Sequence, residues 1–434
     1  MNAVVKAPRA PSFFWAIPAP LKSDSVTIFV FLAMLLIGAD RFGIRAGGFS
    51  LRVVFPVLMA ACGLLYLRHQ QSIRFHKALM VLFLLWGIAG AASSFMSYDP
   101  FRSIGYTIWI LFNFFIIITL FYNFARHSEP SQTLSLWFLV FRIHCALVAL
   151  ELALNILIGA PDIRPQVWFY EPSYLAIFMS AYFGSALFML MRQGRAYLPD
   201  FLLASLTMMM VASATGIFGI LFAILLNLIV ARQRAALLIG TAAVGSLAVG
   251  TLFFFFRETN YYQILVGFLL NGDANLLDMI LLRGGNRVVR ILVGWQAFLQ
   301  HPWLGIGVGA DEAYMGSNPY PEIAWRYIRP WTDLDTGLPF CNAFVSVLGS
   351  TGILGFIPFL GIILYAGAVT LRQMLRGASP ETIAVLIGFF CTLLAMQLDG
   401  TVQRYYLWSP LGLALGMAAY RHQKALSAED RKTQ

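Results

Sequence analysis

The sequence has little charge, few cysteines and no nucleotide-binding motif. Charged residues make up 12% of the 434-residue chain, about half the share that is usual in a soluble domain. The cysteines are scattered and form no CxxC pair, which argues against a structural zinc or an iron–sulfur centre; they are Cys62, Cys145, Cys341 and Cys391. Without a Gly-rich phosphate loop, a reaction driven by ATP or a nucleotide sugar is not indicated. We expect no metal and no cofactor.

Apolar residues dominate what is present. They make up 59% of the chain and come in long runs, which can cross a hydrocarbon core about 30 Å thick at about 1.5 Å per helical residue. The sequence therefore predicts an all-α, polytopic transmembrane helical bundle of about twelve spans. The spans are expected near 25–39, 51–67, 77–96, 104–125, 134–158, 174–192, 198–213, 216–231, 235–256, 353–371, 381–398 and 405–420.

The basic residues predict an orientation. All lysines of the chain and most arginines of the short loops fall on one side of the expected spans, so both termini are expected in the cytoplasm. We divide the chain into spans one to nine (1–256), a large outward loop (257–352), and spans ten to twelve with a cytoplasmic tail (353–434). The outward side has arginine but no lysine. An arginine side chain can donate two hydrogen bonds to one phosphate, so an outward surface with arginine and no lysine suits a phosphate-bearing ligand. The bias that places lysine in the cytoplasm is the alternative explanation.

The segment 286–300, NRVVRILVGWQAFLQ, is predicted to be an amphipathic helix of the outward loop. Arg287 and Arg290 lie one turn apart and can reach one diphosphate together. His301 falls on a similar face but about 21 Å further along the axis. Because Pro302 follows, termination of the helix is favoured for His301 over a role in catalysis.

Glu171 opens the sixth predicted span, in FYEPSYLAIF (169–178). An acidic residue followed by proline suits a helix N-terminus, and a carboxylate at the membrane surface can also take a proton from an attacking hydroxyl. Tyr170 and Tyr174 either stack on sugar rings or belong to an interfacial aromatic belt. No internal repeat is visible, which weighs against a repeat-built transporter.

Two ionisable residues fall inside the fifth predicted span. Charge within a bilayer is costly, so Arg142 and Glu151 should face the bundle interior or a wet cavity. Arg142 is interpreted as structural. Glu151 either lines a substrate cleft or pairs with an arginine such as Arg404 or Arg102.

Two motifs carry a family resemblance. GGNRVVRILVGWQAFLQHPWLGIGVG (284–309) resembles the Arg-led helix and "HPxxGxGxG" of the bacterial O-antigen polymerase and O-antigen ligase superfamily, and CNAFVSVLGSTGILGFIPFL (341–360) is similar to its Asn-led segment. EPSYLA (171–176) is similar to exopolysaccharide polymerases of that group. The resemblance implies a GT-C-type glycosyltransferase of the bacterial inner membrane. The resemblance also implies that the enzyme takes sugars carried on undecaprenyl diphosphate, acts on the periplasmic face and needs no metal.

The resemblance also implies site residues and partners. By position, the family's helix arginine falls on Arg287 and its asparagine on Asn342. The lipid bilayer, a flippase and a chain-length regulator are the implied partners, and nucleic acid is not one. Ligases have a histidine before that asparagine, where this chain has Cys341, and many members have an arginine where it has Ala214. Both departures favour a polymerase and leave the catalytic base unidentified, with Glu171 as the substitute.

We therefore expect an O-antigen or exopolysaccharide polymerase. An acceptor hydroxyl attacks the anomeric carbon of the donor, and Arg287 and Arg290 stabilise the departing diphosphate, so Arg287→Ala should lower turnover more than donor binding. The other expected substrate-binding residues are Arg164, Tyr170, Tyr174, His301, Arg326, Arg329 and Asn342. Two alternatives stay open: a ligase that transfers the glycan to lipid A–core or another acceptor, and a flippase or exporter of lipid-linked sugars.

Overall fold

The computed structural model describes residues 24–39, 41–46, 49–69, 73–160, 163–211, 213–230, 286–317, 340–376, 379–398 and 402–433. Helices dominate these residues, as predicted; one short antiparallel hairpin, β1 (Gly43–Ala46) and β2 (Phe49–Arg52), was not predicted. The ninth predicted span (235–256) lies outside the described residues, as do Arg326 and Arg329.

The remaining predicted spans all coincide with helices. The fourth contains a π-helical stretch, Asn113–Ile118, between α4 and α5, and a 3-10 turn, Gly194–Tyr197, joins α7 to α8. The helices are α1 (Ser25–Leu36), α2 (Val54–His69), α3 (Lys77–Ser94), α4 (Pro100–Phe112), α5 (Thr119–His127), α6 (Pro130–Leu157), α7 (Pro172–Gln193), α8 (Leu198–Val211), α9 (Ala214–Val230), α13 (Asn286–Gln300), α14 (Asp311–Ser317), α16 (Ala343–Leu375), α17 (Pro380–Ala395) and α18 (Tyr405–Thr433).

Among the residues that the structure describes, five helical segments are long and apolar enough to cross a membrane. They are Lys77–Ser94, Pro100–His127, Pro130–Leu157, Pro172–Val211 and Ala343–Leu375, and four shorter apolar helices accompany them. Their lengths and composition fit a membrane protein. The total of twelve spans stays a prediction.

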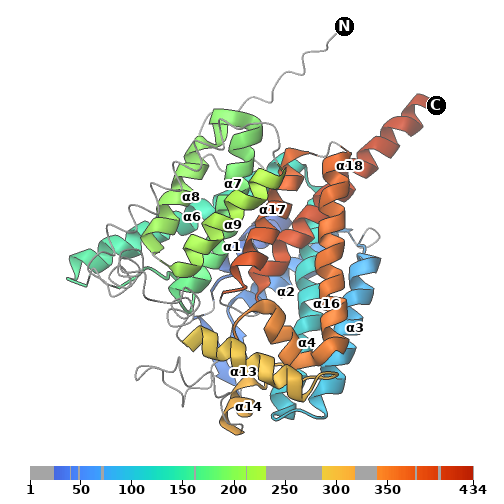
Figure 1. Cartoon of the computed structure of the whole chain (residues 1–434). Coiled ribbons are helices and arrows are strands. Elements are labelled where there is room, and N and C mark those ends of the chain that lie inside the picture. Colours follow the sequence, from blue (N-terminus) through green and yellow to red (C-terminus); the bar gives the residue numbers. More distant parts are fainter. Residues whose placement is uncertain are drawn as a thin grey trace.

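Helix α7 is almost completely buried. Its sequence is apolar on all sides, and nearly all of its residues from Ser173 to Met191 are buried, as expected for a helix with neighbours all round. Gly184 lets α17 approach closely, because a Cβ there would lie 2.4 Å from the sulfur of Cys391. α13 and α14 lie across one end of the bundle, and the C-terminal end of α18 projects from the opposite end (Figure 1). We call the first of these the α13 end.

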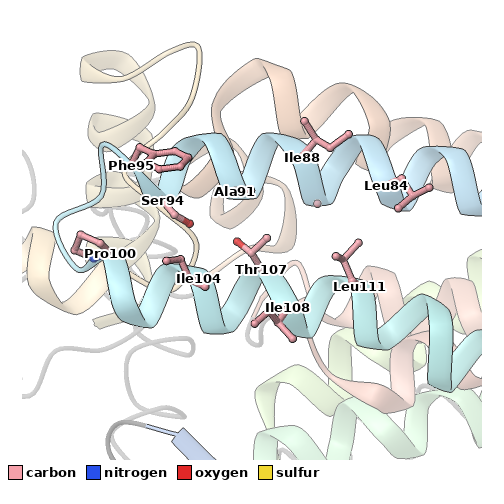
Figure 2. Close-up of a pocket in the computed structure, with 11 residues that line it drawn as sticks. Leu84, Ile88, Ala91, Ser94, Phe95, Pro100, Ile104, Thr107, Ile108 and Leu111 are labelled. Carbon is pink, nitrogen blue, oxygen red and sulfur yellow. The ribbon is translucent and has the colours of Figure 1, made fainter.

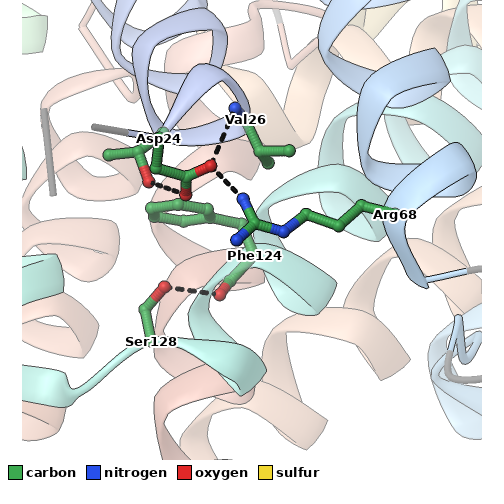
Figure 3. A network of polar contacts seen from close by, with 6 residues as sticks. Asp24, Val26, Arg68, Phe124 and Ser128 are labelled. Atoms are coloured by element: carbon green, nitrogen blue, oxygen red, sulfur yellow. Dashed lines mark hydrogen bonds and ion pairs between the residues drawn. The ribbon is translucent and has the colours of Figure 1, made fainter.

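At the opposite end, one carboxylate ties α1 to α2. Asp24 caps α1 by accepting a hydrogen bond from the backbone N–H of Val26 (3.2 Å), and it forms an ion pair with Arg68 of α2 (Figure 3). Near this pair, the hydroxyl of Ser128 donates to the carbonyl oxygen of Phe124 (2.9 Å) and closes the end of α5. An N-cap of this kind contributes about 1 kcal/mol.

Candidate functional site

The two sequence motifs contact each other at the α13 end. Helix α16 is broken at Gly352, which has φ 59° and ψ −164°, and the loop 301–309 packs against the break. The backbone N–H of Ile353 donates to the carbonyl of Pro302 (2.8 Å), and that of Ile306 donates to the carbonyl of Gly349 (2.9 Å). A Cβ on Gly352 would lie 2.3 Å from the backbone carbon of Trp303. The glycines of both motifs therefore permit backbone-to-backbone contact that any side chain would block.

This docking holds α13 across the start of α16. The buried stripe of α13 packs with residues of the loop, α14 and the entry to α16 in one apolar cluster: Val289, Val293, Ala297, Ile306, Ala310, Tyr314, Met315 and Phe340. Gly294 allows the closest approach, since a Cβ there would lie 2.8 Å from Val345. The predicted helix is confirmed. Its buried face differs from the predicted apolar stripe, which includes the exposed Trp295 and Leu299, because the helix packs through Val289, Val293 and Ala297.

Neither arginine of α13 projects freely into solvent. Arg287 is half-buried, and Arg290 is only 9% exposed. A buried guanidinium in a site of low polarity interacts strongly with any charge that approaches it. The surroundings of Arg290 therefore decide what it can do.

Asp311, the first residue of α14, supplies one countercharge. It is 5% exposed, and its Oδ2 accepts a hydrogen bond from the backbone N–H of Phe340 (3.2 Å). Its Oδ1 is buried and has no hydrogen-bond partner within the described part of the chain. Burial raises the pKa of Asp311 to about 6, against the opposing effects of the Phe340 hydrogen bond and the charges of Arg102 and Arg290. Asp311 therefore interacts with two arginines from different elements.

Arg102 brings α4 into the same group. Its Nη1 donates to Oε2 of Glu312 at 2.5 Å, and its guanidinium lies over the ring of Tyr106 at 5.8 Å. The two arginines and two carboxylates come from α4, α13 and α14; we call Arg102, Arg290, Asp311 and Glu312 the α13 cluster. The sequence reasoning selected Arg290 but missed the other three. In the sequence, Asp311 and Glu312 are visible only as an acidic pair just after the Gly-rich motif, and Arg102 carries no comparable signal.

The Glu171 region forms a second group of contacts. Glu171 precedes α7 in extended conformation, its side chain does not cap the helix, and Ser173 donates a hydrogen bond to its Oε2 (3.0 Å). Tyr174 is buried beneath the guanidinium of Arg404, 4.2 Å from the ring centroid, so one ring face is occupied by a cation. Tyr170 is 59% exposed, and Arg164 is exposed in the preceding loop.

Asn342 and His301 have clear structural contacts. Asn342 takes a left-handed conformation (φ 71°), and its side-chain oxygen accepts from the N–H groups of Phe344 (3.0 Å) and Val345 (3.1 Å). Its amide nitrogen donates to the carbonyl of Gln397 (3.2 Å) and so ties the entry of α16 to α17. His301 ends α13, with its ring edge-on to Tyr98. Substrate contacts by either residue stay a prediction.

The ionisable residues of α6 are held inside the bundle. Arg142 binds Asp200 of α8 through two hydrogen bonds of 2.8 Å each, in agreement with its structural interpretation. Glu151 accepts hydrogen bonds from the backbone N–H groups of Gln166 (3.0 Å) and Val167 (2.5 Å). It thus fixes the loop before α7, and in the part of the chain that the structure describes its partners are these backbone groups and neither Arg404 nor Arg102.

Two further observations limit the chemistry of the site. Cys341 is fully buried, so a substrate in this conformation does not reach the position where ligases have their histidine. Over the ranges that the structure describes, no three His, Cys, Asp or Glu side chains gather as metal ligands.

Comparison with known proteins points to the same region. No curated protein matches the chain. Residues 201–360 match the family model described as O-antigen ligase, a range that includes α13, the Gly-rich loop, α14 and the broken start of α16. This match supports the assignment of the chain to the O-antigen ligase and polymerase superfamily, whose members are glycosyl-transferring membrane enzymes.

Proposed function

We propose that the protein is a polysaccharide polymerase that joins repeat units carried on undecaprenyl diphosphate, at the periplasmic face of the bacterial inner membrane. The observation that carries this proposal is the coincidence of the family match with the α13 cluster. The matched range assembles Arg290, Asp311 and Glu312 around Arg102 at one end of an apolar bundle. Such a site can hold an anionic headgroup while its lipid tail stays in the bilayer.

The proposed reaction is a displacement at the anomeric carbon of the donor. The oxygen of the acceptor hydroxyl forms the new bond to that carbon, and the bond to the diphosphate oxygen breaks. The electron pair leaves with the polyprenyl diphosphate, and the hydroxyl proton passes to a carboxylate. Arg287 and Arg290 face the charge that builds on the leaving group, and preorganised donors of this kind contribute about 3–4 kcal/mol each.

The proton acceptor in this proposal is Glu171. Cys341 is fully buried and Asp311 is 5% exposed, so neither is placed to meet an acceptor hydroxyl. Glu171 is half-buried beside the exposed Tyr170, and the hydroxyl of Ser173 orients its carboxylate. Asp311 instead acts through Arg290, as a positioning residue.

Ligation is the second candidate, because the matched family model bears the description O-antigen ligase. A flippase is less well supported. The charges of the α13 cluster gather at one end of the bundle, whereas Arg142 and Asp200, deeper along α6 and α8, are bonded to each other. Charged groups along a transport path would need to remain open to the cargo.

One assay separates these functions. Purified protein in liposomes is given a lipid-diphosphate-linked repeat unit, and the products are resolved by size. A ladder of longer glycans on the lipid supports the polymerase. A single transfer to added lipid A–core supports the ligase. Movement of the intact substrate across the vesicle, without a new glycosidic bond, would remove the enzyme proposal.

A further inference from the structure

An apolar groove runs between α3 and α4 on the outside of the bundle. It has a volume of about 500 Å³ and is lined from Leu84 to Phe95 on α3 and from Pro100 to Leu111 on α4 (Figure 2). Ile88 is 64% exposed and Ile108 is 61% exposed. Both residues belong to helical segments long and apolar enough to cross a membrane, Lys77–Ser94 and Pro100–His127. Side chains this apolar and this exposed on such segments face lipid.

Small residues on α3 create the groove. Gly87 and Ala91 lie one turn apart on its lining face, so α3 presents a trough toward the larger residues of α4. The hydroxyl groups of the lining are already bonded within the protein: Thr107 donates to the carbonyl of Ser103 (2.9 Å), and Ser94 shares a hydrogen bond with the Ser103 hydroxyl (2.8 Å). The groove therefore offers an apolar surface and fits a hydrocarbon chain.

The length of the groove corresponds to one leaflet. From Leu84 to Phe95 the helix rises about 16 Å, which is about half of a hydrocarbon core roughly 30 Å thick. The groove begins at the α13 end, at Phe95 and Pro100, and stops near the middle of the apolar segments Lys77–Ser94 and Pro100–His127. Its shape suits a linear chain that enters from the headgroup region of that leaflet.

The same end of α4 carries the charge of the candidate site. Pro100 and Ile104 line the groove, while Arg102, between them in sequence, belongs to the α13 cluster. The Gly-rich loop packs directly behind the groove: a Cβ on Gly90 would lie 3.4 Å from Val308, and one on Gly307 would lie 2.9 Å from the Ser103 hydroxyl. The apolar trough thus ends beside an arginine of the α13 cluster. An apolar groove that ends at an arginine side chain suits an anionic headgroup with a long tail.

We propose that this groove holds the isoprenoid tail of the lipid diphosphate, with the diphosphate at the α13 end. The inference rests on the proposed function and deepens it by assigning the lateral path along which the lipid-linked substrate reaches the arginines. Phospholipid acyl chains surround every membrane helix, so the test must show preference for an isoprenoid diphosphate.

Photolabelling provides the test. The full-length protein in phosphatidylglycerol nanodiscs is irradiated with a sugar-free polyprenyl diphosphate that carries a diazirine in its tail, and labelled peptides are identified by mass spectrometry. We expect labelling between Leu84 and Leu111, and competition by unlabelled polyprenyl diphosphate at concentrations where added phospholipid has no effect. Labelling that phospholipid displaces equally well, or that falls on other helices, would overturn the proposal.

A matched pair of variants sharpens the result. Ala91→Phe fills the groove at an exposed position, and Ala78→Phe makes the same change at an exposed position of α3 outside the groove. We expect Ala91→Phe to reduce labelling of 84–111 at least tenfold and to raise the KM for the lipid-linked donor, while Ala78→Phe leaves both unchanged. Equal labelling in both variants while a glycan ladder still forms would overturn the groove assignment alone. Specific labelling of the groove without any ladder would uphold the groove and remove the polymerase.

Discussion

Two groups of buried charges in this protein differ in how completely they are bonded. In the first, Arg142 donates to both carboxylate oxygens of Asp200, and the hydroxyl of Tyr182 donates to one of them as well. In the α13 cluster, Asp311 accepts one backbone hydrogen bond, and its other oxygen has no hydrogen-bond partner in the described residues. Arg102 and Arg290 act on it through charge.

The difference separates a structural contact from a site that can respond to a ligand. The Arg142–Asp200 pair joins α6, α7 and α8, and both carboxylate oxygens already accept hydrogen bonds, so a further charge would not stabilise it. A cluster with an open carboxylate oxygen and two arginines can rearrange when a diphosphate arrives. We therefore expect changes in the first group to alter stability and changes in the second to alter turnover.

The largest effect is expected from Asp200→Ala. This change leaves Arg142 buried without its carboxylate, which costs about 3–5 kcal/mol when one partner of such a pair is removed. Thermal unfolding in detergent should show a much lower midpoint and a low folded yield, while glycosyl transfer per folded molecule stays near wild type. Wild-type stability in this variant would show that the pair is not structural.

A smaller but more specific effect is expected from Asp311→Asn, which keeps the shape of the side chain and removes the charge that positions Arg290. We expect kcat to fall about tenfold, equivalent to about 1.4 kcal/mol, with little change in KM. The wild-type rate should decline as the pH drops through about 6, where Asp311 takes up its proton, and the variant should not show that decline.

The stability of this variant gives the control. The pKa of Asp311 is raised from 3.8 to about 6, so the folded state binds more protons than the unfolded state between these values. Its contribution therefore lowers the free energy of unfolding as pH rises from about 4 to about 6, and that cost persists above 6. Asp311→Asn should then be no less stable than wild type at pH 7. A large loss of stability at that pH would assign Asp311 to the structural group.

Asn342 permits a test of the entry to α16. Asn342→Ala removes the side-chain oxygen that caps the helix, which costs about 1 kcal/mol, whereas glycine at a cap costs only a few tenths. The left-handed φ of 71° adds strain for alanine and none for glycine. Unfolding midpoints should therefore fall in the order wild type, Asn342→Gly, Asn342→Ala. If both variants keep wild-type stability and lose donor binding, the role of Asn342 is contact with the substrate.

The smallest effect is expected from Cys341→Ala. The thiol is fully buried, so its loss removes a small packed group and leaves the reacting atoms untouched. Turnover per folded molecule should stay within about twofold of wild type, with an unchanged pH profile. Abolished turnover in a well-folded variant would place the reacting groups at this position.

Local patterns in the sequence predicted most of the helices. Long apolar runs located the spans, because spacing and length alone decide whether a segment can cross a bilayer. The α13 helix followed from its apolar stripe. The break in α16 at Gly352 was not predicted; the sequence placed only the start of a span near residue 353. The short hairpin before α2 carries no comparable signal.

The candidate site was less predictable because its contacts are distant in sequence. Arg102 and Glu312 are 210 positions apart, and no periodicity along the chain pairs residues from α4 and α14. Tyr174 was selected as a sugar-stacking residue, but its partner Arg404 comes from the other end of the chain. For Glu151 the alternatives were a substrate cleft and an arginine partner. It binds backbone N–H groups of the loop before α7, which a charge pattern does not reveal.

The most direct test of the central claim compares binding and chemistry in Arg290→Ala, with Arg287→Ala beside it. The dissociation constant of the lipid-diphosphate donor and the single-turnover rate of glycosyl transfer are measured separately. Loss of preorganised charge on the leaving group predicts a rate about a hundredfold lower or more for Arg290→Ala, with a change in donor affinity of less than about tenfold. A variant that transfers glycan at the wild-type rate would contradict the account, because the α13 cluster would then have no part in the departure of the diphosphate.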